Sequence, residues 1–192
     1  MNVLLLRADG FLGRHLQIAL ETAGHTVRRG VHRPVRRADE IAVDYARDVD
    51  PDAWRGRLNG VDAVINTVGI LREGRERRFD AIHDQAPRAL FAACREASVD
   101  RVIQVSALGA DAGAASRFHL SKRAADDFLA TLNLEWVIVQ PALDSTGPVV
   151  GCSARSRACR SCRCQAADSS RSSRSTSMIC VSRWCASWCP AP

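Results

Sequence analysis

Short apolar runs alternate with amphipathic stretches along the first three-quarters of the chain. The apolar runs have the length and composition of buried parallel strands, and they fall at residues 2–6, 26–31, 41–44, 61–68, 101–106 and 135–139. The stretches between them predict helices at residues 11–23, 52–58, 79–97 and 117–132. Because crossovers between parallel strands are right-handed, this alternation predicts an α/β fold, a doubly wound parallel sheet with helices on both faces.

The periodic pattern stops near Pro141, and the composition then changes. Residues 151–192 are rich in Ser, Arg and Cys, and they hold seven of the eight cysteines. Such a composition buries too little apolar surface to offset the entropy of the chain. We therefore expect a folded domain at residues 1–143 and an irregular, disordered tail at residues 144–192, with no strand or helix after Gly151.

The charge of the chain also lies in this tail. The whole chain has 27 Lys and Arg against 21 Asp and Glu, and residues 151–192 contribute seven Arg and one Asp, so residues 1–150 are neutral. The sequence pI near 9.2 is therefore no evidence for a nucleic-acid partner, and we expect none. The cysteines Cys159, Cys162 and Cys164 fit no paired four-ligand zinc pattern, so we expect no metal.

The N-terminal part indicates a cytoplasmic protein. Its apolar run at residues 2–6 is too short for a signal peptide or a membrane span, and no basic segment precedes it. Residues 1–150 hold one cysteine, Cys94, which suits a reducing compartment.

Two glycines, Gly10 and Gly13, stand between the first expected strand and the first expected helix. Glycines at such a turn let the backbone approach a pyrophosphate, which then binds the free N–H groups at the start of the helix. An ordinary strand–helix turn is the alternative, and the context favours the nucleotide interpretation.

Three segments carry a resemblance to a known family: the turn RADGFLG, the stretch VDAVINTVGILRE, and FDAIHDQAPRALFAACREASVDRVIQVSALGA. Over residues 1–143 the chain resembles the extended and atypical short-chain dehydrogenase/reductases, which include NAD-dependent epimerases and dehydratases. It is most similar to the group related to the 39 kDa subunit of respiratory complex I. The resemblance implies a Rossmann domain whose NAD(P) cofactor contacts Arg7, Gly10, Phe11, Leu12, Gly13, Asp44, Tyr45, Asn66, Thr67, Val68 and Gly69.

Arg7 departs from the family pattern, because it occupies the place of the first glycine of the turn. A bulky side chain there should strain the turn or crowd the phosphates. A salt bridge from Arg7 to a phosphate is the alternative, but we expect weaker cofactor binding.

The residues after the second expected strand bear on the choice of cofactor. An acidic residue there favours NAD, whereas an arginine accommodates the 2′-phosphate of NADP. This chain has Arg28, Arg29 and Arg33 and no nearby carboxylate in the sequence, and Arg33 precedes Pro34. We favour NADP over NAD by a small margin; a solvated basic loop is the alternative.

The resemblance also assigns the catalytic positions. Ser106 matches the serine that ends the fifth strand and faces the nicotinamide, and Lys122 matches the lysine of the Tyr-x-x-x-Lys pair, which holds the ribose. Phe118 stands where the tyrosine belongs, and phenylalanine has no ionisable proton. His119 is a poor substitute, because adjacent helical residues do not share a face.

Two functions follow from these residues. The chain is expected to be an NAD(P)-binding, oxidoreductase-like protein acting on an unidentified small molecule, or else a non-catalytic nucleotide-binding or assembly subunit. Phe118 favours the second. The resemblance leaves open a partner in a membrane complex or a second copy of the chain.

A change of reading frame offers an explanation for the tail. With GC-rich codons, a shifted frame of residues 162–170, 173–180 and 183–188 yields segments such as Pro-Ile-His-Val-Asp-Asp-Leu, in the order found after the last strand of the same dehydrogenases. We therefore hypothesise a frameshift near Asp144 that replaced a substrate-binding C-terminal part. The DNA sequence of the locus, translated in all frames, tests this hypothesis.

Overall fold

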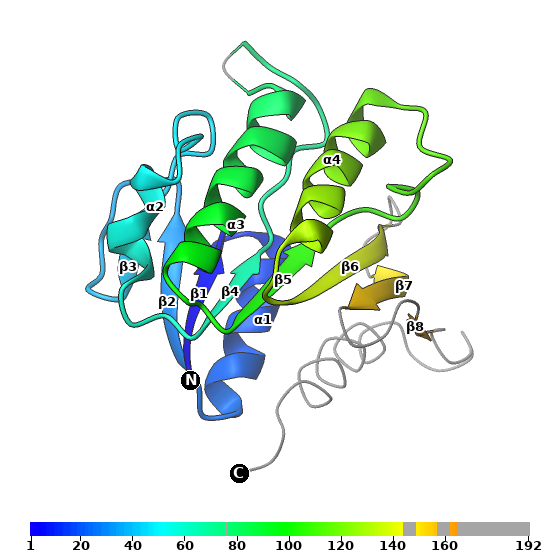
Figure 1. The fold of residues 1–192 in the computed structure, drawn as a ribbon. Helices are drawn as coiled ribbons and strands as arrows, with labels where there is room; N and C mark the ends of the chain where they lie inside the picture. Colours follow the sequence, from blue (N-terminus) through cyan, green and yellow to red (C-terminus); the bar gives the residue numbers. More distant parts are fainter. Residues whose placement is uncertain (76, 144–148, 157–161, 165–192) are drawn as a thin grey trace.

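Six parallel strands form the main part of one sheet (Figure 1). The computed structural model describes residues 1–75, 77–143, 149–156 and 162–164. The parallel strands are β1 (Asn2–Leu6), β2 (Thr26–Val31), β3 (Glu40–Ala42), β4 (Ala63–Asn66), β5 (Arg101–Val105) and β6 (Glu135–Leu143). Their order in the sheet is β3-β2-β1-β4-β5-β6, so the chain changes direction across the sheet between β1 and β4. The predicted doubly wound α/β fold is confirmed.

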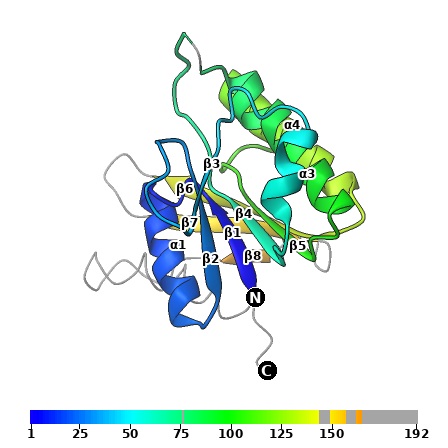
Figure 2. The same cartoon turned by 90° about the vertical axis from the view of Figure 1, so that its left-hand side faces the viewer.

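Helices cover both faces of this sheet. Helix α1 (Phe11–Thr22) lies on one face, and α2 (Asp52–Arg55), α3 (Ala86–Glu96) and α4 (Arg117–Thr131) lie on the other (Figure 2). A 3-10 turn, η1 (Gly56–Leu58), follows α2, and a π-helix, η2 (Asp80–Gln85), precedes α3. In the part of the chain that the structure describes, no helix has the length and apolar character to cross a membrane.

The two faces of the sheet bury separate apolar clusters. Leu4 of β1 packs in the cluster on the side of α2, α3 and α4, together with Trp54 and Phe91, whereas Leu5 packs with Leu16 of α1 on the other side. Successive strand residues point to opposite faces, so a strand covered by helices on both sides needs a continuous apolar run. This requirement explains the sequence NVLLL of β1.

The helix predicted at residues 79–97 is not uninterrupted. Residues 80–85 form η2, and α3 follows with Pro87 in its first turn. Proline has no N–H, and its ring clashes with the carbonyl four residues earlier, which belongs to His83. The π-helical turns place the discontinuity before α3, and π-helical segments are frequent at functional sites.

Two antiparallel strands correct the prediction that no strand follows Gly151. Strand β7 (Val149–Ser156) pairs with the edge of β6, and β8 (Cys162–Cys164) pairs with β7. The apolar pattern missed them because strand pairing uses backbone groups, and the open edge of β6 presents unpaired N–H and C=O groups whatever the added side chains are. The remaining tail predictions concern residues that lie outside the described ranges.

Candidate functional site

A cleft of about 630 Å³ opens at the carboxyl ends of the strands. Residues from five segments line it: the β1–α1 turn, the end of β2, the residues after β3, the loop after β4, and η2. This is the position where the strand order reverses, and open α/β sheets bind ligands there. The lining comprises Arg7, Asp9, Gly30, His32, Arg33, Val43, Asp44, Tyr45, Ala46, Arg47, Val68, Ile70, Arg77 and Ile82.

The glycine turn lies beside this cleft. A Cβ atom on Gly13 would lie 2.2 Å from the carbonyl oxygen of Arg7 and 2.7 Å from the Cα atom of Ala8, so the close approach of α1 to the turn requires glycine there. Gly10 is the N-cap of α1, and no side chain caps this end of the helix. The first N–H groups of α1 are therefore not taken by a capping side chain, which suits an anion such as a pyrophosphate.

Arg7 has a left-handed backbone conformation, with φ of 57°. For a residue other than glycine this conformation costs about 1–2 kcal/mol. Its guanidinium donates a hydrogen bond from Nη1 to the carbonyl oxygen of Gly69 and also lines the cleft. Arg7 thus connects the β1–α1 turn with the loop that follows β4.

A carboxylate near Arg33 corrects the sequence analysis, which found none. Glu40 opens β3 beside Arg29 of β2, and its side chain is fully buried. Its Oε1 accepts a hydrogen bond from Arg33 Nη2 at 2.6 Å, and its Oε2 accepts one from Arg33 Nη1 at 3.0 Å. These hydrogen bonds, and a further one from the backbone N–H of Arg36, lower the pKa of Glu40 to about 2. Arg33 is therefore held at the rim of the cleft by a carboxylate seven residues away.

Tyr45 and Asn66 belong to a buried polar network. The Tyr45 hydroxyl donates to Asn66 Oδ1 at 2.8 Å, and Asn66 Nδ2 donates to Gln104 Oε1 at 2.7 Å. Burial raises the pKa of Tyr45. The side chain of Thr67 is also used within the fold, because its hydroxyl donates to the carbonyl of Leu6 at 2.7 Å. These side chains fix the ends of neighbouring strands.

Lys122 reaches the loop after β4. Its Nζ donates hydrogen bonds to the carbonyl oxygens of Val68 at 3.1 Å and Val105 at 3.2 Å, and the residue is only 4% exposed. Burial lowers the pKa of Lys122 to about 8; the charge of Arg7 acts in the same direction and that of Asp126 in the opposite one. The structure thus brings Lys122 against the predicted cofactor loop at its Val68 end.

Ser106 is bound to a carboxylate that the sequence analysis missed. Its Oγ donates to Asp126 Oδ2 at 2.5 Å, and Asp126 is fully buried. Asp126 lies one helical turn after Lys122, on the buried face of α4 that also holds Ser121, Ala125 and Leu129. This i+4 spacing is the signal that could have identified it.

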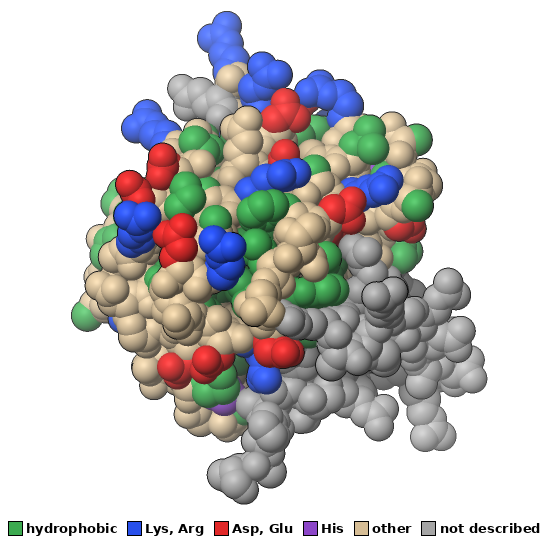
Figure 3. Space-filling model, viewed as in Figure 1, with side chains coloured by type: hydrophobic (Ala, Val, Ile, Leu, Met, Phe, Trp, Pro, Cys, Tyr) green, Lys and Arg blue, Asp and Glu red, His purple; other side chains and the backbone are tan. Residues whose placement is uncertain are grey.

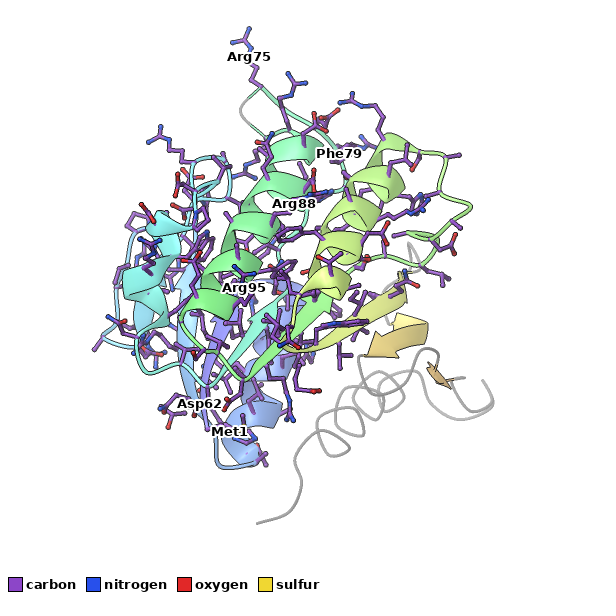
Figure 4. All side chains as sticks on the ribbon, viewed as in Figure 1. Met1, Asp62, Arg75, Phe79, Arg88 and Arg95 are labelled. Atoms are coloured by element: carbon purple, nitrogen blue, oxygen red, sulfur yellow. The ribbon has the colours of Figure 1, made fainter. Side chains whose placement is uncertain are left out.

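Phe118 packs among aromatic rings. Its ring centroid lies 5.7 Å from that of Phe79 and 5.3 Å from that of His83, which the sequence analysis also missed. Phe79 lies where η2 meets α4, whereas Arg75 of the preceding loop extends into solvent (Figure 4). His119 is engaged at the start of α4, where its Nδ1 lies 2.7 Å from Ser116 Oγ.

The predicted residues divide into two sets. Arg7, Arg33, Asp44, Tyr45 and Val68 line the cleft. The others lie outside that lining: Gly10, Phe11, Leu12, Gly13, Asn66, Thr67, Gly69, Ser106 and Lys122. Gly30 lines the cleft but was not predicted; a Cβ atom there would lie 2.5 Å from Leu6 Cδ2, and its position within a strand gave only a weak signal.

Basic side chains surround this end of the molecule. Arginine side chains gather over its upper part, around the loop between β4 and η2, in the space-filling view (Figure 3). From that loop Arg77 reaches the lining of the cleft, to which Arg7, Arg33 and Arg47 also contribute. The cleft is thus suited to a ligand that carries phosphate groups.

Known proteins share both the sequence pattern and the fold. The NAD(P)H-binding family pattern matches residues 8–156. A ceramide reductase of Caulobacter vibrioides is 32% identical over 143 residues, which are 72% of this chain and 45% of that protein. Subunit 9 of the NADH dehydrogenase [ubiquinone] 1 alpha subcomplex of Arabidopsis thaliana is 31% identical over 145 residues, with 70% and 36% covered.

Solved structures share the fold at lower identity. A short-chain dehydrogenase/reductase superfamily protein of Agrobacterium tumefaciens with bound NAD has a TM-score of 0.61 and 23% identity, with 72% of this chain and 48% of that chain covered. The present chain spans less than half the length of the two curated relatives. Because the family pattern matches more than half of the chain, the protein belongs to the NAD(P)H-binding family, whose cofactor is a nicotinamide dinucleotide. It is similar to an NADH dehydrogenase subunit in sequence and to a short-chain dehydrogenase/reductase in fold.

Proposed function

We propose that this chain is an oxidoreductase-like domain that binds NADP in preference to NAD. The observation that carries the proposal is the glycine turn at Gly13, which lies beside a cleft lined by four arginines. His32 and Arg33 follow β2, where an NAD-type site has an acidic residue. Glu40 holds Arg33 by two hydrogen bonds, and Arg33 still lines the cleft.

The chain's own residues have separable roles in this proposal. The turn from Gly10 to Gly13 receives the pyrophosphate at the start of α1, and Lys122 contributes a buried cation close to the loop after β4. Ser106 is the matching serine, and Asp126 orients its hydroxyl. A bound nicotinamide dinucleotide supplies hydride-transfer chemistry. Such chemistry also needs a proton donor, and Phe118 cannot be that donor.

Phe118 supports a second candidate, a non-catalytic nucleotide-binding or assembly subunit. Its ring packs against Phe79 and His83, so the position serves the packing of η2 on α4. The similarity to an NADH dehydrogenase subunit favours a partner in a larger complex, and a homo-oligomer is the other candidate. A small-molecule substrate remains part of the enzymatic proposal. We place the protein in the cytoplasm, where the buried Cys94 thiol, with its pKa raised by burial, stays reduced.

Binding measurements on the full chain test the cofactor proposal. NADPH and NADH are titrated while NAD(P)H fluorescence is recorded, and NADPH should bind at least about tenfold more tightly. Arg33→Ala should lose most of this preference, because it removes the guanidinium at the rim of the cleft. Arg55→Ala is the control for charge, since Arg55 pairs with Asp52 and Glu96 instead. Equal affinities for both dinucleotides, or an equal loss for both in Arg33→Ala, would contradict the NADP preference.

A gain-of-function variant separates the two candidate functions. Phe118→Tyr restores an ionisable hydroxyl four residues before Lys122, on the same helical face. An enzyme should then oxidise NADPH faster with at least one member of a carbonyl panel. No gain in a folded variant that binds NADPH would favour the assembly subunit.

A further inference from the structure

Three consecutive residues of the loop that follows β4 each accept a hydrogen bond from, or donate one to, a different part of the fold. Lys122 of α4 donates to the carbonyl of Val68, and Arg7 donates to the carbonyl of Gly69. The third contact comes from η2, where His83 Nε2 accepts a hydrogen bond from the backbone N–H of Ile70 at 2.9 Å. The sequence predicted Lys122 and Arg7 as residues of the cofactor site, but it did not predict a role for His83.

The protonation state of His83 follows from its hydrogen bonds. Nε2 accepts from a backbone N–H, so the ring proton is assigned to Nδ1, which lies 3.1 Å from Ser121 Oγ. Ser121 Oγ donates in turn to the carbonyl of Phe118 at 2.8 Å. Burial, together with the nearby charge of Lys122, lowers the pKa of His83 to about 3, so the imidazole is neutral near pH 7.

Aromatic contacts fix the plane of the His83 ring. It stacks on Phe79 with centroids 5.1 Å apart and an interplanar angle of 18°, and it meets Phe118 edge to face at 83°. The residue is fully buried within η2. An imidazole that is stacked on Phe79, contacted by Phe118 and engaged at both nitrogens has one orientation, and that orientation directs Nε2 at the loop.

These contacts exclude His83 as a substitute for the absent tyrosine. The ring lies beside Phe118, but both of its nitrogens are engaged within the fold and the side chain has no exposed surface. A general acid needs a transferable proton within reach of the reacting group. The His83 proton points instead at Ser121, within the packing of η2 against α4.

The loop that His83 holds forms a wall of the cleft. Val68 and Ile70 line the cleft, and Gly69 lies between them. A Cβ atom on Gly69 would lie 3.1 Å from Lys122 Nζ and 3.6 Å from His83 Nε2. Any shift of Ile70 would therefore change the cleft wall and the distance between the loop and the Lys122 cation together.

We propose that His83 is a positioning residue for dinucleotide binding: as a neutral acceptor for the Ile70 N–H, it keeps the Val68–Ile70 loop against Lys122 and in the wall of the cleft. The proposal rests on the proposed cofactor function. In this proposal η2 directs the acceptor Nε2 of His83 at the neighbouring Val68–Ile70 loop.

Three variants of the full chain test this role. His83→Leu removes the acceptor at similar volume, whereas His83→Gln keeps a carbonyl oxygen near the position of Nε2. Ser121→Ala is the matched control, because it removes the partner of Nδ1 and leaves the Ile70 contact in place. Each variant is assayed for hydrogen exchange at the Ile70 amide and for NADPH affinity, at a temperature where thermal unfolding shows it to be folded. In His83→Leu we expect the Ile70 amide to lose its protection from hydrogen exchange and the affinity for NADPH to fall about tenfold. In His83→Gln and Ser121→Ala, both the Ile70 exchange rate and the NADPH affinity should stay close to those of the parent protein.

Other outcomes are equally informative. An Ile70 amide that stays protected in His83→Leu, or an unchanged NADPH affinity, would overturn the proposal. A folded His83→Gln that is as weak as His83→Leu would assign the effect to packing and overturn it too. If His83→Leu does not fold, His83→Met provides the same comparison with a more adaptable side chain. If the parent protein binds neither NADPH nor NADH, the cofactor function fails, and Ile70 exchange still decides whether His83 holds the loop.

Discussion

Replacing Arg7 separates the backbone strain of the turn from the effect of the guanidinium. Arg7 has φ of 57°, and its side chain reaches the Gly69 carbonyl. Glycine adopts this conformation freely, whereas alanine keeps the strain and loses the side chain. The variants Arg7→Gly and Arg7→Ala therefore differ by one methyl group, the Cβ of alanine, which disfavours the left-handed backbone conformation of residue 7.

The expected stabilities follow from three contributions. Left-handed strain costs about 1–2 kcal/mol, the hydrogen bond to Gly69 contributes about 1 kcal/mol, and glycine loses roughly 0.7 kcal/mol through the entropy of the unfolded chain. Arg7→Gly should thus lie within about 1 kcal/mol of the parent protein in its free energy of unfolding. Arg7→Ala should be less stable than Arg7→Gly by about 1 kcal/mol. Urea denaturation measures both values.

Cofactor affinity gives the second readout. In the parent protein the guanidinium of Arg7 is hydrogen-bonded to the Gly69 carbonyl. This hydrogen bond must break before a phosphate can take the place of the guanidinium or bind to it. Removing the guanidinium should tighten NADPH binding about fivefold, which corresponds to the roughly 1 kcal/mol of that hydrogen bond, because the contacts of Lys122 and His83 still hold the loop. Arg14→Ala is the charge control, since Arg14 donates to the Asp9 carbonyl on the same turn.

The pH dependence of binding should change as well. Arg7 lowers the pKa of Lys122, which is about 8, so the Lys122 cation is lost as the pH rises through that value. NADPH affinity of the parent protein should therefore fall above about pH 8, and in Arg7→Gly the fall should move to higher pH. Weaker NADPH binding in Arg7→Gly would show that Arg7 is a phosphate ligand. Equal stability of the glycine and alanine variants would refute the strain argument.

Three further predictions concern the turn and the buried carboxylates. Gly13→Ala should lower the free energy of unfolding by about 3 kcal/mol, because backbone atoms lie within 3 Å of the added Cβ atom; Gly56→Ala, where no atom lies within 4 Å, is the control in the same unfolding assay. Glu40→Gln should flatten the acid side of the stability profile. The pKa of Glu40 is lowered from 4.5 to about 2, so the stability it contributes is present above pH 4.5 and lost as the pH falls toward 2, which denaturation from pH 7 to 2 measures. Asp126→Asn should lower the pH at which NADPH affinity falls, because Asp126 raises the pKa of Lys122; an unchanged midpoint would contradict this.

Local patterns in the sequence were sufficient to predict the six parallel strands and the helices that cover them. The run NVLLL has apolar residues for both faces of a strand, and residues 101–105 repeat this feature in RVIQV. The apolar pattern did not reveal the π-helix before α3, because that discontinuity depends on how Pro87 meets the preceding carbonyls. It also did not reveal β7, which pairs through backbone groups and needs no apolar period.

The polar groups of the site depend on contacts between distant segments. Glu40 reaches Arg33 because β3 pairs with β2, and Asp126 reaches Ser106 across twenty residues. His83 and Ile70 are thirteen residues apart and meet because η2 packs beside the loop. No spacing rule for a single element relates these pairs.

The sequence by itself determined the order of the strands and helices, the glycine turn and the absence of a hydroxyl at Phe118, because each is a property of one residue or one local period. Only the tertiary structure decided which side chains hold Arg33, Ser106 and Ile70. Burial makes an unpaired polar group costly, so each must find its partner among whatever groups the fold brings within hydrogen-bond distance. Those partners are set by the packing of whole elements, which the local pattern of residues does not encode.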